Sequence, residues 1–373
     1  MRTIALLIFA TCIALPIAQA QTRSSPFDDW DANGDGQLTQ AEFPERFPKT
    51  LFEQVDTNDD GLISRAEDDA YRARNQNRKR EDSAPQIPTP TPTAVRQKET
   101  RIPAGTIIEK DIVYETVGDR KLPLDLYLPA NTNGPSPLII WIHGGGWKSG
   151  SKNGIARCEG MLARGYAIAS VEYRLSGEAI FPAAIEDCKA AISFLRLNAK
   201  EYNLDPNRFG AWGSSAGGHL VALLGVTSDV SDFDMHPVTQ KASSQVQAVC
   251  NWFGPTDFLR MNDFPGKIDH DAADSPESRF IGAAIQENKK KSQRANPINY
   301  VSPSDPPFLH MHGDADQSVP YNQSELLHAA LEKARVPTTL YKVRNGGHGF
   351  KGATESEEDL FKRSADFFDR MLH

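Results

Sequence analysis

A serine flanked by glycines between two apolar runs constrains the fold of this chain most. Ser215 lies in a G-x-S-x-G match at 213–217, with a strand-like run at 209–212 before it and a helix-like run at 218–224 after it. A serine at such a strand-to-helix elbow presents its Oγ at a sheet edge, ready to attack a carbonyl. Glycines suit so tight a turn because side chains two residues away would clash and because glycine tolerates strained backbone. The match predicts a nucleophile if the chain also supplies a histidine, an acid and backbone donors.

Apolar runs with strand spacing alternate with helical spacing from about residue 105 onward. Strands are predicted at 107–114, 122–128, 137–142, 166–171, 246–252, 307–312 and 338–343, and helices at 182–197 and near 355–371. This alternation predicts an α/β fold with a doubly wound, mostly parallel sheet. Residues 258–300 fit no sheet unit, and we expect them to form a cap or substrate wall over the carboxyl ends of the strands.

A glycine-rich loop follows the continuous apolar run at 137–142. Its Gly144, Gly145 and Gly146 leave backbone N–H groups free to point at a ligand. An acyl-transfer intermediate needs such donors for its oxyanion, and the N–H of Ala216, directly after the serine, would complete the set. A loop of this composition also occurs as an ordinary strand-to-helix connection. Its place upstream of the serine elbow favours the catalytic interpretation.

The base and the acid are expected after later strands. His348 lies in a glycine-rich loop after the last predicted strand, which can bring its imidazole to the serine. The acid is expected between serine and histidine, where residues 313–320 contain both Asp314 and Asp316. Spacing alone does not separate these two, and the other one would be a turn-forming aspartate. Asp257, after the preceding strand, is a weaker candidate.

Residues 105–373 resemble the α/β-hydrolase fold, and within it the BD-FAE-like and hormone-sensitive-lipase-like esterases of the acetyl esterase/lipase group. The resemblance is carried by HGGGW at 143–147, YRL at 173–175, FPAAIED at 181–187, GSSAGG at 213–218, HGDADQSVP at 312–320 and GGHGF at 346–350. It implies a Ser215–His348–Asp316 triad, because in that family the acid lies three residues before the valine of the V-P pair. It also implies an acyl-enzyme, no cofactor for catalysis, and a small ester or an acylated polysaccharide as substrate.

The resemblance favours a serine carboxylesterase related to lipases, and two other functions compete with this interpretation. Serine peptidases of the prolyl-oligopeptidase type share the elbow and the late Asp and His, but they lack the HGGG loop in this form. A non-catalytic, calcium-dependent binding protein on a hydrolase scaffold is the third interpretation, and the intact Ser, His and Asp set counts against it.

Two acidic twelve-residue segments near the N-terminus match the EF-hand calcium loop, with a glycine at the sixth place for the sharp turn. The expected ligands are Asp31, Asn33, Asp35, the carbonyl of Gln37 and Glu42 in the first loop, and Asp56, Asn58, Asp60, the carbonyl of Leu62 and Glu67 in the second. Two matches in tandem predict a small α-helical EF-hand pair at 21–71. We expect its Ca²⁺ to be structural and to leave Ser215 unaffected.

The N-terminal segment predicts export, and a second segment predicts a linker. Arg2, the apolar run at 4–10 and Ala18-Gln19-Ala20 are typical of a signal peptide at 1–20, so the protein is expected to be secreted or periplasmic. Residues 72–104 predict a disordered Pro/Thr-rich linker to a catalytic domain at 105–373. No other segment approaches the ~20 apolar residues of a spanning helix.

Charge and cysteines narrow the partners and the redox state. The net charge of −8 argues against nucleic acid as a partner. Cleavage of the signal would leave Cys158, Cys188 and Cys250, which allow either one disulfide and a free thiol or three buried thiols.

Overall fold

The structure is a computed structural model, and the chain divides into two compact units, Met1–Val95 and Arg96–His373. It describes residues 27, 30, 31, 33, 35–43, 52, 55, 56, 61–68, 71, 102–130, 132–155, 157–264 and 266–373. The predicted signal peptide and nearly all of the predicted linker lie outside these residues. The predicted boundaries between the segments stay predictions.

The described part of the first unit is built around a short antiparallel pair of strands. Strand β1 (Gln37–Thr39) pairs with β2 (Leu62–Ser64), and Leu38 lies opposite Ile63. A small apolar core surrounds this pair, and it contains Phe27, Leu38, Phe52, Val55 and Ile63. The two acidic loops are therefore joined through the short strands that lie within them.

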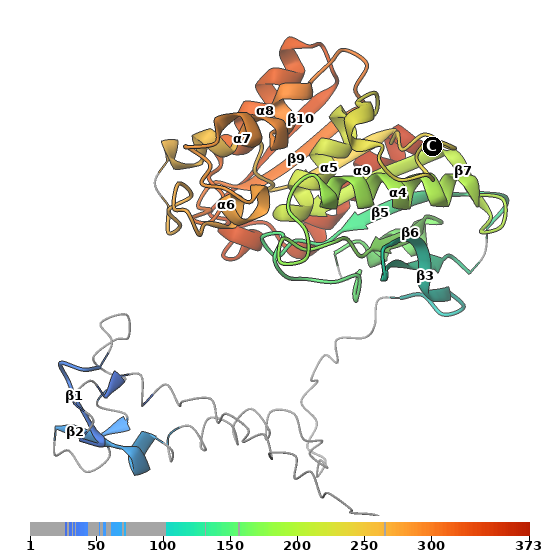
Figure 1. Cartoon of the computed structure of the whole chain (residues 1–373). Helices are drawn as coiled ribbons and strands as arrows, with labels where there is room; N and C mark the ends of the chain where they lie inside the picture. Colours follow the sequence, from blue (N-terminus) through green and yellow to red (C-terminus); the bar gives the residue numbers. More distant parts are fainter. Residues whose placement is uncertain are drawn as a thin grey trace, which may run out of the picture. The chain divides into compact units, whose positions relative to one another are not determined.

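An eight-stranded sheet forms the second unit, in the order β10-β9-β8-β7-β5-β6-β4-β3 (Figure 1). The strands are β3 (Ile107–Val117), β4 (Arg120–Leu128), β5 (Ser136–Ile142), β6 (Ala167–Val171), β7 (Leu204–Ser214), β8 (Ala248–Trp252), β9 (Phe308–Gly313) and β10 (Thr338–Val343). Strand β4 runs antiparallel to both β3 and β6, and all other neighbours are parallel. The predicted doubly wound, mostly parallel α/β sheet is confirmed.

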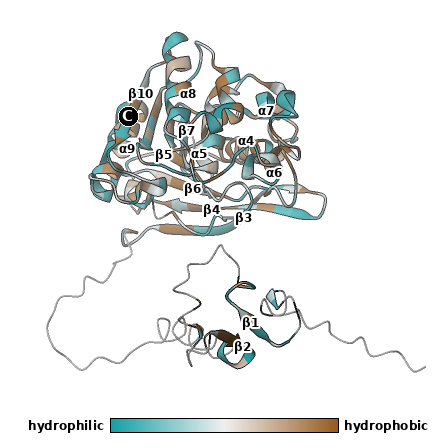
Figure 2. Cartoon of the chain, turned by 90° about the vertical axis from the view of Figure 1, so that its left-hand side faces the viewer, coloured by the Kyte–Doolittle hydropathy of each residue, from teal (hydrophilic) through white to brown (hydrophobic). Residues whose placement is uncertain are grey.

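Strand β5 shows why helices cover both faces of the sheet. Successive side chains of a strand point to opposite faces. Leu138, Ile140 and Ile142 accordingly enter one core cluster, while Ile139 and Trp141 enter the other. Every residue of β5 is buried, so both faces must be covered. Figure 2 colours β5 as hydrophobic, in contrast to the largely hydrophilic helix α7 (Lys289–Ala295).

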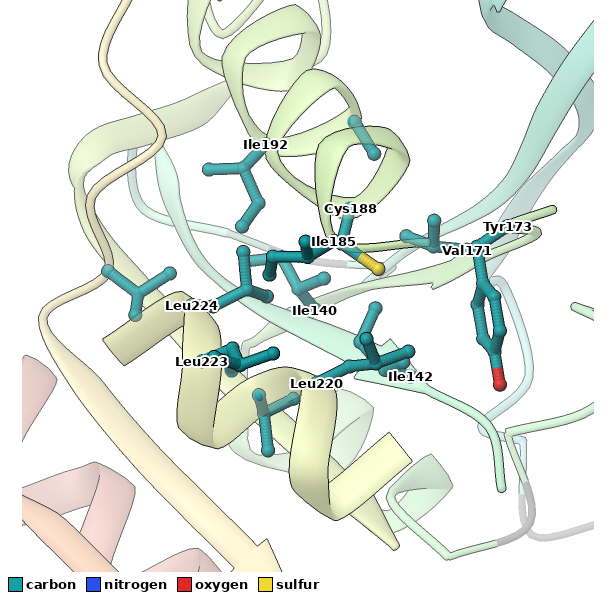
Figure 3. Close-up of a cluster of buried hydrophobic side chains, with 14 of the residues drawn as sticks. Ile140, Ile142, Val171, Tyr173, Ile185, Cys188, Ile192, Leu220, Leu223 and Leu224 are labelled. Atoms are coloured by element: carbon teal, nitrogen blue, oxygen red, sulfur yellow. The ribbon is translucent and has the colours of Figure 1, made fainter. Parts of the chain in front are cut away.

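Helices α4 (Ala183–Leu197), α5 (Ala216–Val226) and α8 (Asn322–Lys333) contribute to the first cluster, whereas η1 (Glu159–Arg164) and α9 (Glu357–Leu372) contribute to the second. Figure 3 shows the contact of α4 and α5 with the sheet, made by Ile185, Cys188 and Ile192 of α4, Leu220, Leu223 and Leu224 of α5, and Ile140 and Ile142 of β5. Each such buried aliphatic side chain contributes roughly 1.5–3 kcal/mol. This packing holds the base of the serine elbow.

The carboxyl ends of the parallel strands carry the loops of interest. Because these ends meet at one edge of the sheet, the segments after β5, β7, β9 and β10 converge there. The segment at 258–300 contributes only helices among its described residues, namely η3 (Phe258–Asp263), α6 (Pro276–Ile281), α7 and η4 (Pro297–Tyr300). This agrees with the absence of a sheet pattern in its sequence.

Two further points concern the described part of the chain. Cys158, Cys188 and Cys250 are all buried and free, which selects the alternative of three buried thiols. Burial raises the pKa of each of these thiols. None of the helices in the described residues combines the length and the apolar character of a membrane span.

Candidate functional site: a serine, histidine and aspartate at the sheet edge

Ser215 lies at the turn between β7 and α5, as the G-x-S-x-G match predicts. Its backbone has φ 56° and ψ −124°, a left-handed conformation that costs a residue with a side chain of order 1–3 kcal/mol. Two hydrogen bonds hold it there. The Ser215 N–H donates to the Trp252 carbonyl at 2.9 Å, and the Ser215 carbonyl accepts from the His219 N–H at 3.0 Å. Helix α5 and strand β8 thus hold the strained serine in place.

The flanking glycines are required by crowding. A Cβ atom on Gly213 would overlap the carbonyl oxygen of Gly217, and one on Gly217 would overlap the carbonyl oxygen of Ile142. Backbone cannot give way as a side chain can, so both positions exclude larger residues. The motif therefore reflects how closely β7, α5 and β5 approach one another.

His348 connects the serine to an aspartate. Its Nε2 lies 3.0 Å from Ser215 Oγ, and its Nδ1 lies 2.8 Å from Asp316 Oδ2. An ionised Asp316 only accepts hydrogen bonds, so Nδ1 carries the hydrogen and Nε2 is left to accept from the serine hydroxyl. The three side chains come from the loops after β7, β9 and β10, and together they have the geometry of a nucleophile, a base and an orienting acid.

The structure separates the two aspartates that spacing left open. Asp316 is buried, and its Oδ1 accepts from the N–H groups of Ser318 and Val319 at 2.8 and 3.0 Å. Asp314 is exposed, and its Oδ1 accepts from the Asn345 N–H at 2.7 Å. Asp316 therefore faces the imidazole, whereas Asp314 stabilises the turn that carries His348.

Asp257, the weaker candidate for the acid, bonds groups other than His348. Its Oδ1 accepts from the Leu259 N–H at 3.2 Å and from Asn296 Nδ2 at 2.7 Å. Burial raises the pKa of Asp257. It caps the start of η3, which is a structural task.

The electrostatics around Asp316 favour its ionised form. Burial alone would raise the pKa of Asp316, but hydrogen bonding and charge from His312 and His348 hold it well below its usual range. His312 is fully buried, with Nε2 2.9 Å from the Val319 carbonyl and 3.6 Å from Asp316 Oδ2. No motif of the sequence gave His312 a role. The signal for it is its place four residues before Asp316, on β9, which ends at Gly313 just before the acid.

The predicted oxyanion loop lies against the serine. A Cβ atom on Gly144 would come 2.7 Å from the Ser214 carbonyl oxygen and 3.2 Å from Ser215 Cβ. Gly145 and Gly146 have φ of 115° and 58°, and the Gly145 carbonyl accepts from Ser149 N and Oγ at 3.1 and 3.0 Å. Ala216 begins α5, where backbone N–H groups have no partner within the helix. The structure therefore brings Gly144 and Ala216 next to Ser215, whereas the contacts of Gly145 and Gly146 are with Ser149 and Pro276.

Trp147 connects this loop to the segment at 258–300. Its indole stacks on Phe280 of α6 with centroids 4.6 Å apart, and its Nε1–H donates to His219 Nδ1 at 3.3 Å. His219 Nε2 in turn donates to the Ala295 carbonyl at 2.8 Å. Burial lowers the pKa of His219 to about 4, so the ring is neutral at neutral pH. Gly146 also faces Pro276, since a Cβ there would lie 3.6 Å from the proline Cβ.

The predicted calcium loops have the expected glycine geometry. Gly36 and Gly61 both have φ 82°, and their N–H groups donate to Asp31 and Asp56 Oδ2 at 2.8 and 2.9 Å. Such a left-handed position after an acidic first residue is the turn that an EF-hand loop needs. Asn58 and Asp60 lie outside the described residues.

The other described calcium-ligand candidates lie further along the same two loops. Glu42 Oε2 accepts from the Thr39 N–H at 3.0 Å and Glu67 Oε2 from the Ser64 N–H at 2.9 Å, at the same place in each loop. Asn33 Oδ1 accepts from the Asp35 N–H at 2.8 Å. Gln37 and Leu62 begin β1 and β2. Within the described residues, no group of three or more His, Cys, Asp or Glu side chains is arranged to hold a metal ion. The donor set and the turns still suit Ca²⁺.

Comparison with known proteins gives two family matches. The family model BD-FAE matches residues 124–331, and the EF hand model matches residues 49–67. The second match covers the second of the two predicted calcium loops.

The similar proteins carry esterase names. Esterase LipQ of Mycobacterium tuberculosis is 31% identical over 240 residues, which are 62% of this chain and 55% of that protein. A solved truncated carbohydrate esterase from gut microbiota is 33% identical, with a TM-score of 0.64, over 73% of this chain and 99% of that one. A propionate-bound esterase of Thermogutta terrifontis is 25% identical, with a TM-score of 0.57, over 72% and 94% of the two chains. The chain spans about half the length of the curated relatives it matches.

Proposed function

The chain belongs to the BD-FAE family of α/β-hydrolase-fold proteins, and on that premise we propose that it is a serine carboxylic ester hydrolase acting on short-chain acyl esters of carbohydrates. One observation carries the proposal. His348 lies within hydrogen-bond distance of both Asp316 Oδ2, at 2.8 Å, and Ser215 Oγ, at 3.0 Å, and Ser215 lies on a strained elbow.

The first half of the reaction forms an acyl-enzyme. Ser215 Oγ attacks the ester carbonyl carbon while His348 Nε2 takes the hydroxyl proton. The ionised Asp316 orients the imidazole and stabilises its charged form. Collapse of the tetrahedral intermediate breaks the bond to the alcohol, and His348 gives its proton to the departing alkoxide.

The second half returns the free enzyme. Water attacks the acyl carbon, His348 takes its proton, and the carboxylic acid leaves as the proton returns to Ser215. Each tetrahedral intermediate has an oxyanion, for which we propose the N–H groups of Ala216 and of the loop at Gly144, Gly145 and Gly146. Loss of one such donor costs roughly 2.7–4 kcal/mol in the transition state.

The substrate class rests on the similar structures. One is named a carbohydrate esterase, and another is an esterase described as propionate-bound. Both cover more than nine-tenths of their own chains in the match. These names support a short-chain acyl group on a sugar as the substrate of this chain.

We further propose export and a structural calcium module. The basic and apolar N-terminal residues 1–20 support a signal peptide. The EF-hand match at 49–67 and the left-handed Gly36 and Gly61 support Ca²⁺ binding by the two acidic loops. Bound Ca²⁺ would neutralise the clustered carboxylates of those loops and so favour their folded form.

The direct test is hydrolysis of 4-nitrophenyl esters from acetate to octanoate and of acetylated xylan, by the wild type, Ser215→Ala and Ser214→Ala. Ser214 is the matched control, because it neighbours Ser215, whereas the His348 ring bonds Ser215 and Asp316. We expect Ser215→Ala to lower kcat by at least about 10⁴-fold. Full activity of that variant, or a wild type inert toward every ester, would contradict the proposal.

A further inference from the structure

A pocket adjoins the loop that follows His348. Its volume is about 360 Å³, within the range of small-molecule sites. Its walls combine aromatic and charged side chains, chiefly Trp252, Phe350 and Phe361, with Arg157, Lys351 and Glu355. The reaction steps described above do not use this pocket.

Both aromatic walls are directly connected to the reacting residues. The carbonyl of Trp252 accepts the Ser215 N–H at 2.9 Å. Phe350 lies two residues after His348, and its ring centroid is 5.0 Å from that of Trp252. Phe253 bridges the remaining distance, with centroids 5.0 Å from His348 and 4.8 Å from Phe350. The pocket therefore begins at the back of the catalytic loop.

The polar lining offers donors and acceptors in balance. Arg157 is exposed, with Cζ 5.7 Å from the Trp252 ring centroid, and its Nη2 would lie 3.8 Å from a Cβ on Gly349. Lys351 supplies a second cation. Glu355 and Glu357 supply two carboxylates. Glu355 Oε1 accepts from the Tyr341 hydroxyl at 3.1 Å. Cations and carboxylates therefore offset each other, which suits a neutral ligand better than an ion.

A sugar unit matches this lining. Its hydroxyl groups both donate and accept hydrogen bonds, and its C–H faces pack on aromatic rings. Charged donors such as a guanidinium make stronger hydrogen bonds than neutral ones. An ion would instead need a surplus of one charge, which this pocket lacks.

We propose that the pocket binds a neutral glycosyl unit of the alcohol that the enzyme releases. The proposal rests on the proposed ester hydrolysis, because His348 must protonate the departing alkoxide and the leaving group therefore lies beside the His348 loop. Arg157 then acts as a specificity residue that contacts the sugar. The acyl group lies on the other side, toward the oxyanion loop.

The test compares two acetyl esters that share an acyl group and differ in the alcohol. Acetate release is measured for acetylated xylotetraose and for ethyl acetate, with the wild type, Arg157→Ala and the control Arg370→Ala. Arg370 is also exposed, but it lies in the last turn of α9, away from the pocket lining. For Arg157→Ala we expect the ratio of kcat/KM on acetylated xylotetraose to that on ethyl acetate to fall about tenfold, chiefly through KM, as for the loss of one charged hydrogen bond. Arg370→Ala should keep the wild-type ratio.

A second readout is inhibition by unacylated xylotetraose. It should compete with ethyl acetate in the wild type and about tenfold more weakly in Arg157→Ala. An unchanged ratio, an equal loss on both esters, or inhibition confined to oligosaccharides that carry carboxylates would each overturn the neutral glycosyl assignment. A wild type inactive on acetylated xylotetraose as well as on ethyl acetate and 4-nitrophenyl acetate would instead overturn the proposed function.

Discussion

The indole Nε1–H of Trp147 donates to Nδ1 of His219 at 3.3 Å, which joins the predicted oxyanion loop to the helix that begins after Ser215. Both side chains are buried, and His219 also bonds the Ala295 carbonyl at 2.8 Å. The neutral ring uses one nitrogen as acceptor and the other as donor. A protonated His219 would lose the acceptor, and with it the bond to Trp147.

This pair predicts sensitivity to acid. Since an unfolded histidine binds a proton below about pH 6.5 and folded His219 only below about pH 4, the free energy of unfolding falls as the pH is lowered through that window. Between about pH 7 and pH 5, the free energy of unfolding should therefore fall on the order of 1–2 kcal/mol less in His219→Gln than in the wild type. Urea unfolding at each pH, followed by tryptophan fluorescence, measures this free energy. Identical pH dependence in the wild type and the variant would contradict the assignment.

Exchanging the carboxyl groups of the two neighbouring aspartates for amides should separate their roles. Asp316→Asn removes the charge that stabilises the imidazolium and favours the wrong tautomer, so kcat should fall about 10⁴-fold. Asp314→Asn keeps an acceptor for the Asn345 N–H and should change kcat by less than about tenfold. Steady-state kinetics on 4-nitrophenyl acetate checks both. If kcat fell further in Asp314→Asn than in Asp316→Asn, the assignment of Asp316 as the acid would be wrong.

Substitution of an elbow glycine should be costly although only one methyl group is added. Gly217→Ala places Cβ against the Ile142 carbonyl oxygen. We therefore expect the free energy of unfolding to fall by about 1–3 kcal/mol and ester turnover to fall below about a tenth of the wild-type value. Gly177→Ala is the control, because its Cβ would meet nothing within 4 Å. Thermal melting and ester turnover measure the two effects. A Gly217→Ala protein with wild-type values would show that the elbow has room.

Calcium removal should affect the first unit alone. A chelator is expected to lower the melting temperature of that unit, because the loop carboxylates lose their counter-ion, and to leave ester turnover within about twofold. Extracellular EF-hand sites bind with Kd of roughly 10⁻⁴–10⁻³ M, so millimolar Ca²⁺ should reverse the shift. Calorimetry with and without Ca²⁺ provides the measurement, and Glu67→Gln should reproduce part of the shift. A large loss of turnover in chelator would refute the independence of the two units.

Much of the fold followed from local patterns. The apolar run at 137–142 predicted a strand buried on both faces, and the alternating units predicted the parallel sheet. Helix α8 was not predicted, because only Leu327 and Leu331 among its apolar side chains are fully buried, which leaves a weak periodic signal. The helices of the segment at 258–300 were not predicted either, because they are short and are held by aromatic contacts with distant residues such as Trp147.

The candidate site divides in the same way. Ser215, His348 and the glycine loop were predictable because each is part of a local turn with its own glycines. The choice between Asp314 and Asp316 depended on which carboxyl group faces a side chain 32 residues away, which spacing within one turn cannot reveal. The place of His312 behind Asp316 and the pocket beside Phe350 depend on contacts among three loops, so no single segment indicates them.

The hydrogen bond from the Ser215 amide to the Trp252 carbonyl makes Ser215 part of the sheet's own backbone network. Its amide hydrogen should therefore exchange with solvent only through the rare openings that also expose the central strands. Heating should consequently abolish turnover and melt the sheet in one transition, without a folded but inactive form in between.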